Sequence, residues 1–280
     1  MMQRALSTHL FANQKLTTAL LDQIQSAGIP RIEVFCARQH LDYRNRTQTS
    51  EVALWFRNSS MHVHSMHSPI YTDEYWGRSG NDTTITITEP IKAKRIPMID
   101  EIKRTLELAE TTPYRYLIQH LGVVDQPFGM RAVDAAFTSL EELMIFARHR
   151  GVEILLENIP NQLSSAEGLL RFNELTGLEL NFCFDTGHAH MHEGVVNAYN
   201  FLRPRIRSTH VHDNNGEDDS HLFPFSEGTI DWTSAMSALR CEPDQYPLLL
   251  ELKEVPEIEH PLDEVQRTFD RLEELRDEHE

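Results

Sequence analysis

Short apolar segments alternate along the whole chain with segments of helical periodicity. The apolar or β-branched runs fall at residues 4–9, 31–35, 60–66, 116–120, 152–157, 178–185, 206–212 and 247–252. Each run has the length of a buried strand. Between the runs, apolar residues recur three or four positions apart, as in Leu16, Ala19, Leu20 and Ile24 ahead of Gly28, which is the pattern of one helix face. The sequence therefore predicts eight strands, each followed by a helical segment.

Regular alternation of strand and helix implies parallel strands joined by right-handed crossovers. Eight such units favour an α/β fold of the (β/α)₈ or TIM-barrel type over an open doubly wound sheet. A flavodoxin-like or Rossmann sheet is the alternative, disfavoured by the strand count and by the absence of a GxGxxG or GxxxxGK[ST] loop. With 280 residues the chain has the length of one such barrel, so a single domain over residues 1–280 is expected.

One predicted connection, at about residues 68–90, is much longer than the others and reads SPIYTDEYWGRSGNDTTITITEP. Long loops that follow barrel strands usually cover binding sites. Tyr71, Tyr75, Trp76 and Arg78 are candidates for a lid over a bound ligand. A decorated surface loop with some local strand is the alternative interpretation.

The charge balance limits the class of ligand. Lys and Arg number 26 against 43 Asp and Glu, which gives a formal net charge of −17. Binding a polyanion requires clustered basic side chains that displace counterions from phosphates. Nucleic acid is therefore disfavoured as a partner, although a local basic patch is compatible with the sequence, and a small-molecule substrate is favoured.

Three isolated cysteines, Cys36, Cys183 and Cys241, show no CxxC spacing, so neither a disulfide framework nor a thiolate zinc site is indicated. This usage predicts a reducing, cytoplasmic location. The first residues lack the apolar core of a signal peptide, and no segment has the about 20 apolar residues that span a bilayer. No membrane association is expected, and no motif indicates an oligomeric state.

Ionisable side chains end six successive apolar runs. The third to eighth runs close with HVHSMHSP, YLIQHLG, EILLENIP, LNFCFDTGHAH, STHVHDNN and LLLELK. In a barrel these strand ends meet at one mouth, where catalytic residues lie. Glu157 and Glu251 each follow an aliphatic run, where a carboxylate without a cation would cost several kcal/mol to desolvate.

A mixed set of imidazoles and carboxylates without thiolate suits Mn²⁺, Mg²⁺, Zn²⁺ or Fe²⁺. Taken singly, a His or Glu at a strand end is more often a hydrogen-bonded or solvated side chain than a ligand. Their convergence on one mouth favours a divalent-metal site, and with it a metal-dependent enzyme that polarises a substrate oxygen or activates water.

These segments resemble the xylose-isomerase-like barrel superfamily, which includes sugar isomerases and epimerases and the endonuclease IV type of apurinic/apyrimidinic endonuclease. The resemblance extends over essentially the whole chain. It is carried by HSP at 67–69, QHLG around His120, LLEN ending at 157–158, FDTGH at 184–188, HVHDN at 210–214, DSH at 219–221 followed by EGTIDW, and LLLEL around Glu251.

The isomerase and epimerase branch implies four metal ligands, Glu157, Asp185, His210 and Glu251. It also implies that Glu157 and Glu251 are catalytic and move a proton next to a metal-polarised carbonyl through an enediolate. The expected substrate-binding residues are His188, His212, Trp76 and Asn158, with His212 as a substrate contact or a partner of a ligand. An arginine that ketohexose epimerases carry after the seventh-strand motif is replaced here by 214–216, Asn-Asn-Gly, which disfavours a free ketohexose.

The endonuclease branch implies three zinc ions, and this chain fills all of its ligand positions. His67, His120 and Glu157 match the first ion. Asp185, His210 and Glu251 join Glu157 at the second, and His188, Asp219 and His221 match the third. The segment after HSP adds acidic groups where a DNA-binding loop requires positive charge.

Three hypotheses therefore stand. The first is a metal-dependent isomerase or epimerase of a sugar, sugar phosphate or polyol, with a small carbohydrate as substrate. The second is a zinc-dependent phosphodiesterase of the endonuclease IV kind, and the third is a non-catalytic barrel that binds a metal or ligand.

Overall fold

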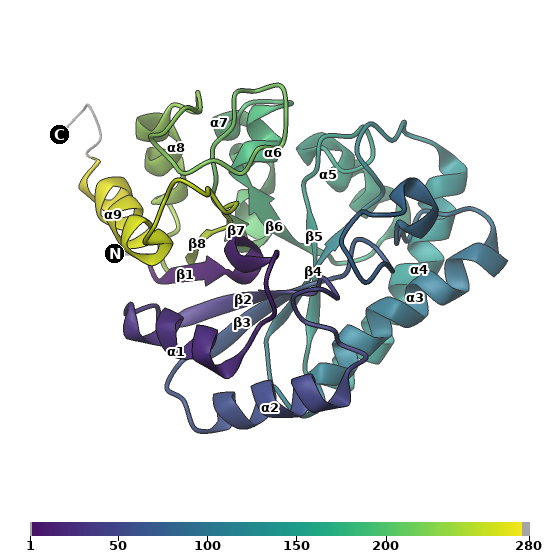
Figure 1. Cartoon of the computed structure of the whole chain (residues 1–280). Helices are drawn as coiled ribbons and strands as arrows, with labels where there is room; N and C mark the ends of the chain where they lie inside the picture. The colour runs from purple at the N-terminus through teal and green to yellow at the C-terminus, as the bar shows by residue number, and fades with distance from the viewer. Residues whose placement is uncertain (1, 276–280) are drawn as a thin grey trace.

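Eight parallel strands lie at the centre of the molecule, and helices surround them (Figure 1). The computed structural model describes residues 2–275. Its strands are β1 (Arg4–Ser7), β2 (Arg31–Phe35), β3 (His62–His67), β4 (Tyr116–His120), β5 (Glu153–Glu157), β6 (Asn181–Asp185), β7 (Ile206–His210) and β8 (Leu248–Leu250). The predicted TIM barrel is confirmed.

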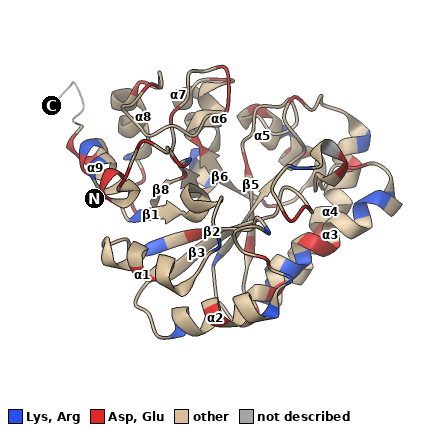
Figure 2. Cartoon of the chain, viewed as in Figure 1, with Lys and Arg blue, Asp and Glu red and all other residues tan. Residues whose placement is uncertain are grey.

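Helices connect successive strands and form the outer layer. They are α1 (Thr18–Ser26), α2 (Arg46–Arg57), α3 (Lys92–Glu107), α4 (Met130–Arg148), α5 (Ala166–Thr176), α6 (Thr186–His190), α7 (Val195–Leu202), α8 (Trp232–Leu239) and α9 (Pro261–Glu274), with short 3₁₀ turns at η1 (Thr8–Phe11), η2 (Gly80–Thr83), η3 (Leu108–Glu110) and η4 (Arg203–Arg205). Lys and Arg are concentrated on the outer helix α3, whereas α9 carries more acidic than basic residues (Figure 2). Among residues 2–275, no helix is both long and apolar enough to cross a membrane.

The barrel closes because β8, which pairs with β1 at one end of the sheet, also contacts β7 at the other end. Strand β8 pairs in parallel with β1, and α9 lies beside β1 in Figure 1, where Arg4 binds Asp270 and Glu273. On the other side, the N–H of Val211 donates to the carbonyl of Leu249 at 2.8 Å, and the N–H of Glu251 donates to Val211 at 3.2 Å. This second contact brings the end of β7 next to the end of β8.

Several strands end earlier or later than the apolar runs suggest. Strand β1 stops at Ser7 because the Ser7 hydroxyl accepts from the N–H of His9 and caps the 3₁₀ turn Thr8–Phe11. Strand β7 stops at His210, where its ladder with β6 ends, and Val211 pairs instead with Leu250 in an isolated bridge. Strand β3 continues to His67, one residue beyond its predicted end. These differences all fall at strand ends, where side-chain hydrogen bonds compete with the ladder.

Side chains of each strand alternate between the barrel interior and the layer beneath the helices. Ile118, Leu155 and Cys183 form a small apolar cluster of their own, while their neighbours Leu117, Leu156 and Phe184 belong to the large outer core. The residues two positions after the inner cluster are His120, Glu157 and Asp185. Period-two alternation therefore turns these polar side chains toward the barrel axis, directly above an apolar floor.

The long connection after β3 folds back on itself. Tyr71 and Thr84 form an antiparallel bridge, and the N–H of Ile85 donates to Ile70 at 2.8 Å. Trp76 packs edge-on against Phe35 and His9, with ring centroids 5.0 and 5.4 Å apart. Tyr75 is 58% exposed. In this segment Trp76 therefore covers the mouth, whereas Tyr75 lies on the protein surface.

Candidate metal centre

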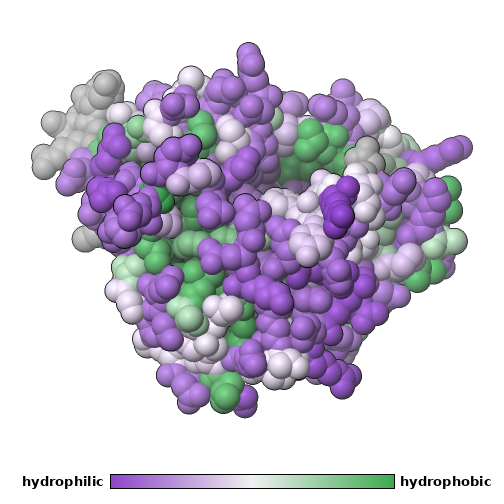
Figure 3. Space-filling model, viewed as in Figure 1, coloured by the Kyte–Doolittle hydropathy of each residue, from purple (hydrophilic) through white to green (hydrophobic). Residues whose placement is uncertain are grey.

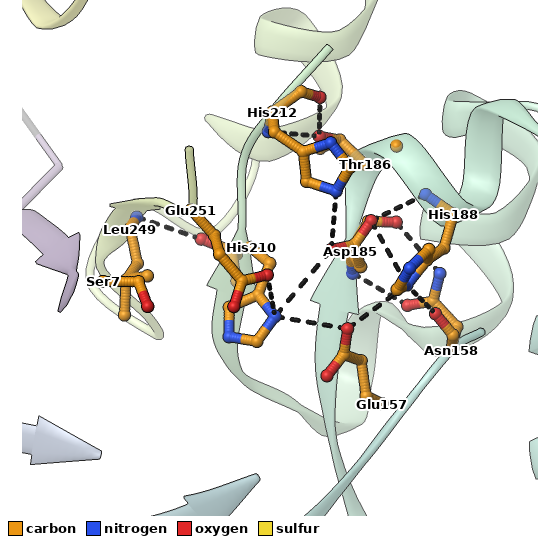
Figure 4. A network of polar contacts seen from close by, with 12 residues as sticks. Ser7, Glu157, Asn158, Asp185, Thr186, His188, His210, His212, Leu249 and Glu251 are labelled. Atoms are coloured by element: carbon orange, nitrogen blue, oxygen red, sulfur yellow. Dashed lines mark hydrogen bonds and ion pairs between the residues drawn. The ribbon is translucent and has the colours of Figure 1, made fainter. Parts of the chain in front are cut away.

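Four side chains from neighbouring strands meet at the mouth. Glu157, Asp185 and His210 are the last residues of β5, β6 and β7, Glu251 directly follows β8, and all four are between 0 and 3% exposed. One potential ligand atom from each lies within 4.8 Å of the others. In Figure 4, His210 stands between the carboxylates, with Nδ1 3.1 Å from Glu251 Oε2, 3.2 Å from Glu157 Oε1 and 3.8 Å from Asp185 Oδ2.

Two buried atoms of this group have no hydrogen-bond partner among the described residues, His210 Nδ1 and Glu157 Oε2. A buried polar atom without a partner costs about 1–3 kcal/mol, and more when it is charged. Three carboxylates around one imidazole also repel one another unless a cation lies among them. The orphaned atoms and the oxygen-plus-imidazole donor set fit a divalent cation at this position.

The protonation of the group reflects the same crowding. Burial raises the pKa of Glu251 above its usual range, and the carboxylates of Glu157 and Glu33 add to the rise against the opposing effect of His210. Burial also opposes ionisation of Glu157, but His210 and His120 hold its pKa well below the usual range. The two glutamates therefore differ in proton affinity although both face His210.

Two further groups of potential ligands flank this core. His67 Nε2 and His120 Nε2 lie 3.4 and 3.3 Å from Glu157 Oε2, and these three residues form one group of metal-ligand geometry. On the other side, His221 Nε2 and His188 Nε2 lie 3.2 and 3.1 Å from Asp219 Oδ2. The structure thus brings together every position that the resemblance to the endonuclease branch implies.

His212 links the four-residue core to the outer group around Asp219. Its Nε2 lies 3.1 Å from Asp185 Oδ2 and 3.7 Å from Asp219 Oδ1, and its ring stacks on His221 with a centroid distance of 4.0 Å. His212 is 0% exposed. It therefore connects Asp185 to the Asp219 side of the mouth rather than facing the open space above it.

The expected substrate-binding residues divide into two kinds. His188 and Trp76 line the cavity above the core. Asn158 is instead committed to the backbone of Asp185: its Oδ1 accepts from the Asp185 N–H at 2.8 Å, and its Nδ2 donates to the Asp185 carbonyl at 2.9 Å. Asn158 thereby ties the end of β5 to the end of β6 and holds two of the four core residues in register.

The cavity above the core has a volume of about 320 Å³, and Glu157 and Glu251 both line it. Within the described part of the chain, Lys253 is the one Lys or Arg on its walls. A neighbouring cavity of about 540 Å³ shares Trp76, His120, His188 and Asp219 with it and is walled mainly by apolar residues of the long connection and of the loop after β4. The face drawn in Figure 3 is largely hydrophilic, with apolar side chains gathered in a few patches between the polar ones.

Two residues of the site were not found from the sequence, His9 and Glu33. His9 is 6% exposed, lines the cavity and hydrogen-bonds the Leu252 carbonyl through Nδ1 at 3.0 Å. Burial and the neighbouring His221 lower its pKa well below the usual range. Glu33 lies in the middle of β2 and is 0% exposed. A charged residue inside the run RIEVF is the one sequence signal that pointed to it.

An eight-stranded parallel barrel with carboxylates and imidazoles at the carboxyl ends of its strands has a donor set that suits a divalent metal. The chain belongs to the family of xylose isomerase-like TIM barrels, whose model matches residues 21–275. This match confirms the resemblance carried by the sequence motifs.

Curated relatives match only in part. An uncharacterized protein of Sinorhizobium fredii is 26% identical over 166 residues, which cover 55% of this chain and 52% of the relative. An uncharacterized protein of Methanocaldococcus jannaschii is 28% identical over 153 residues, which cover 51% of this chain and 52% of the relative. The chain thus spans about half the length of the curated relatives it matches.

Solved structures match over nearly their whole length. A D-tagatose 3-epimerase-like protein has a TM-score of 0.75 at 20% identity and covers 98% of this chain and 99% of its own. The 3-keto-D-glucoside 4-epimerase of E. coli has a TM-score of 0.74 at 16% identity, with 98% and 99% covered. The IOLI protein, whose structure binds a zinc atom, has a TM-score of 0.78 at 16% identity, with 97% and 98% covered. At these identities the similarity shows the shared fold.

Proposed function

We propose that the protein is a divalent-metal-dependent isomerase or epimerase of a sugar or a sugar derivative such as a sugar phosphate or polyol. The observation that carries this proposal is the pair Glu157 and Glu251. Both carboxylates touch Nδ1 of His210 from different strands, at 3.2 and 3.1 Å, and both face the same cavity. Two carboxylates on either side of one substrate are suited to remove a proton and to return one.

In this proposal, Glu157, Asp185, His210 and Glu251 hold the ion, which when bound supplies Lewis-acid polarisation of a substrate oxygen. One glutamate takes the proton from the carbon next to the substrate carbonyl. Return of the proton by the other glutamate inverts that carbon, and return to the neighbouring carbon gives the isomer.

The surroundings of the pair support a small polar substrate. His188 lines the cavity, and its Nε2 and Nδ1 contact Asp219 Oδ2 at 3.1 Å and the Asn158 carbonyl at 3.0 Å, so in this proposal it binds a substrate hydroxyl by exchanging Asp219 for the substrate. Trp76 and Phe35 supply apolar walls above the core, as sugar-binding sites commonly have. Two of the structural neighbours are described as a sugar 3-epimerase-like protein and a keto-glucoside epimerase, which supports the same class of substrate.

Proton exchange tests the proposal without knowledge of the final product. The protein is loaded separately with Mn²⁺, Mg²⁺ or Zn²⁺ and incubated in D₂O with a panel of aldoses, ketoses, keto-glycosides and sugar phosphates. We expect deuterium at the carbon next to the carbonyl of one substrate class, detected by NMR. We also expect Glu251→Gln to slow this exchange by roughly 10²–10⁴-fold, the usual contribution of a general acid–base group.

The matched control is Glu101→Gln, the same change at a buried carboxylate of α3 that binds Tyr43 and Arg44. It should exchange deuterium like the wild type. If Glu251→Gln leaves both metal content and exchange unchanged, the assigned role of Glu251 is wrong. Metal binding without exchange on any member of the panel would favour the non-catalytic barrel.

A zinc-dependent phosphodiesterase of the endonuclease IV kind is the second candidate. The observation that favours it is the presence of the outer groups His67–His120–Glu157 and His212–Asp219–His221 beside the core. The scarcity of Lys and Arg on the cavity walls opposes a DNA substrate. Three zinc ions per chain together with cleavage of abasic-site DNA would replace the isomerase proposal with this one.

A further inference from the structure

A fourth carboxylate lies behind the candidate metal ligands, in contact with His210. Glu33 extends from the middle of β2 into the barrel interior, where it is 0% exposed. It accepts hydrogen bonds from the Ser7 hydroxyl at 3.0 Å and from the Ser65 hydroxyl at 2.8 Å. Its two oxygens each lie 3.1 Å from Nε2 of His210. Three strands, β1, β3 and β7, therefore supply the partners of this one side chain.

A carboxylate buried this deeply needs partners that compensate for the loss of water. An ionised carboxylate buried without a compensating partner carries a desolvation penalty of several kcal/mol. The two serine hydroxyls satisfy its lone pairs but bring no charge. Among the described residues that hydrogen-bond Glu33, His210 is the one whose ring can be positively charged, or can be polarised by a cation bound at its other nitrogen.

The contact also determines how the His210 ring is placed. An imidazole has two nitrogens on different edges of the ring, and each is free to serve one partner. Because Nε2 is held by Glu33, Nδ1 is directed at Glu157 and Glu251, 3.2 and 3.1 Å away. A ring whose Nε2 carries the proton donated to Glu33 presents an unprotonated Nδ1 toward the metal position.

We propose that Glu33 is a positioning residue that orients His210 for metal binding and strengthens it as a ligand. The proposal rests on the metal site of the proposed function. A carboxylate that accepts the second ring N–H of a ligating histidine fixes the ring and its tautomer and increases its basicity toward the metal. Ser7 and Ser65 hold the carboxylate in place. Residues of β1 and β3 therefore help to orient the His210 side chain of β7, across the barrel.

Direct metal titration tests the proposal independently of catalysis. Glu33→Gln keeps the size of the side chain and one oxygen that can accept from His210, but it removes the charge. Calorimetric titration of the metal-free variant with Zn²⁺ should show an affinity roughly 10–100-fold below that of the wild type. The visible absorption spectrum of the Co²⁺-loaded variant should also change, because a reoriented imidazole alters the ligand field.

Two control variants separate positioning from a general effect on the fold. Glu101→Gln makes the same change at a buried carboxylate away from the mouth, bonded to Tyr43 and Arg44 at 2.9 Å each, and should bind Zn²⁺ like the wild type. Ser65→Ala removes one donor to Glu33 but leaves its charge, and should weaken binding by a smaller factor. Ser65→Ala also provides the measurement if Glu33→Gln does not fold.

The outcomes are distinct. A Glu33→Gln protein that binds Zn²⁺ within twofold of the wild type, with an unchanged Co²⁺ spectrum, overturns the role of Glu33 while leaving the metal site intact. The same holds if Glu101→Gln loses as much affinity as Glu33→Gln. A wild type that binds neither metal overturns the proposed function together with this inference.

Discussion

Replacing Gly187 with alanine tests how closely α6 packs against the site. A Cβ at residue 187 would lie 2.0 Å from Cε1 and 2.5 Å from Nδ1 of His212. Carbon atoms in contact are about 3.5–4.0 Å apart, so the His212 ring would have to move by about 1.5 Å. It has little room to do so, because it is 0% exposed and stacks on His221 at 4.0 Å.

The cost can be built from two parts. Forcing one extra methyl group into a well-packed region costs about 1–3 kcal/mol. Moving His212 also breaks its hydrogen bond to Asp185, 3.1 Å long in the structure, and a bond to a charged group contributes about 1.5–3 kcal/mol. We therefore expect Gly187→Ala to lower the free energy of unfolding by about 2–6 kcal/mol and to weaken metal binding, because Asp185 loses a partner that orients it.

Urea denaturation of the metal-free protein, with Zn²⁺ titration of the folded variant, measures both effects. The control is Gly129→Ala, since a Cβ there meets no atom within 4 Å and its φ of −160° is extended backbone open to any residue. That variant should stay within about 0.5 kcal/mol of the wild type. If Gly187→Ala proves as stable as Gly129→Ala and binds Zn²⁺ equally well, the packing of α6 on His212 is not as described.

Three further predictions concern pH, a buried hydrogen bond and a helix end. Burial lowers the pKa of His221, but the adjacent Asp219 outweighs it and raises the pKa to about 9. The stability this pair adds to the metal-free protein is therefore complete below about pH 6.5, the ordinary histidine value, and is lost as the pH rises toward about 9. Denaturation in chelator across this range should show the decline, and a rising profile would contradict it. Trp232→Phe removes the indole N–H that donates to buried Asp213 at 2.6 Å. It should lower the free energy of unfolding, measured with urea, by about 1–3 kcal/mol. A decrease below about 0.5 kcal/mol would show that water replaces the donor. Gly177→Ala should cost about 1 kcal/mol by the same measurement, because Gly177 ends α5 with φ of 65°, a conformation that suits glycine. An unchanged stability would mean that the helix end relaxes.

The barrel could be predicted because its signals are local. Runs such as YLIQH and EILLE have the length and apolar content of buried parallel strands, and the helical segments between them keep an apolar face. The predicted ends of β1, β7 and β8 each lie two residues beyond the observed ends. At these ends long-range contacts, such as that of Val211 with Leu250, replace the strand pairing. The local sequence pattern does not indicate such contacts.

The gathering of the candidate metal ligands at one mouth could be predicted for a related reason. Glu157, Asp185 and His210 each close an apolar run, and a barrel gathers all such ends at one mouth. His9 and Glu33 do not close an apolar run in this way. The apolar residues beside them are compatible with a side chain that faces either the barrel interior or the outside. Their roles depend on which face of the strand looks inward, and a shift of one residue would reverse that face.

By itself, the sequence determined the number of strands, their parallel order and the chemical character of the mouth, because periodicity and strand ends are properties of short segments. Only the tertiary structure decided which groups touch. Glu33 and His210 lie 177 positions apart in the chain, and His210 meets Glu251 because the barrel closes between β7 and β8. Contacts of this range depend on the direction and register of whole strands, which are fixed when the barrel closes and the inward side chains pack against one another.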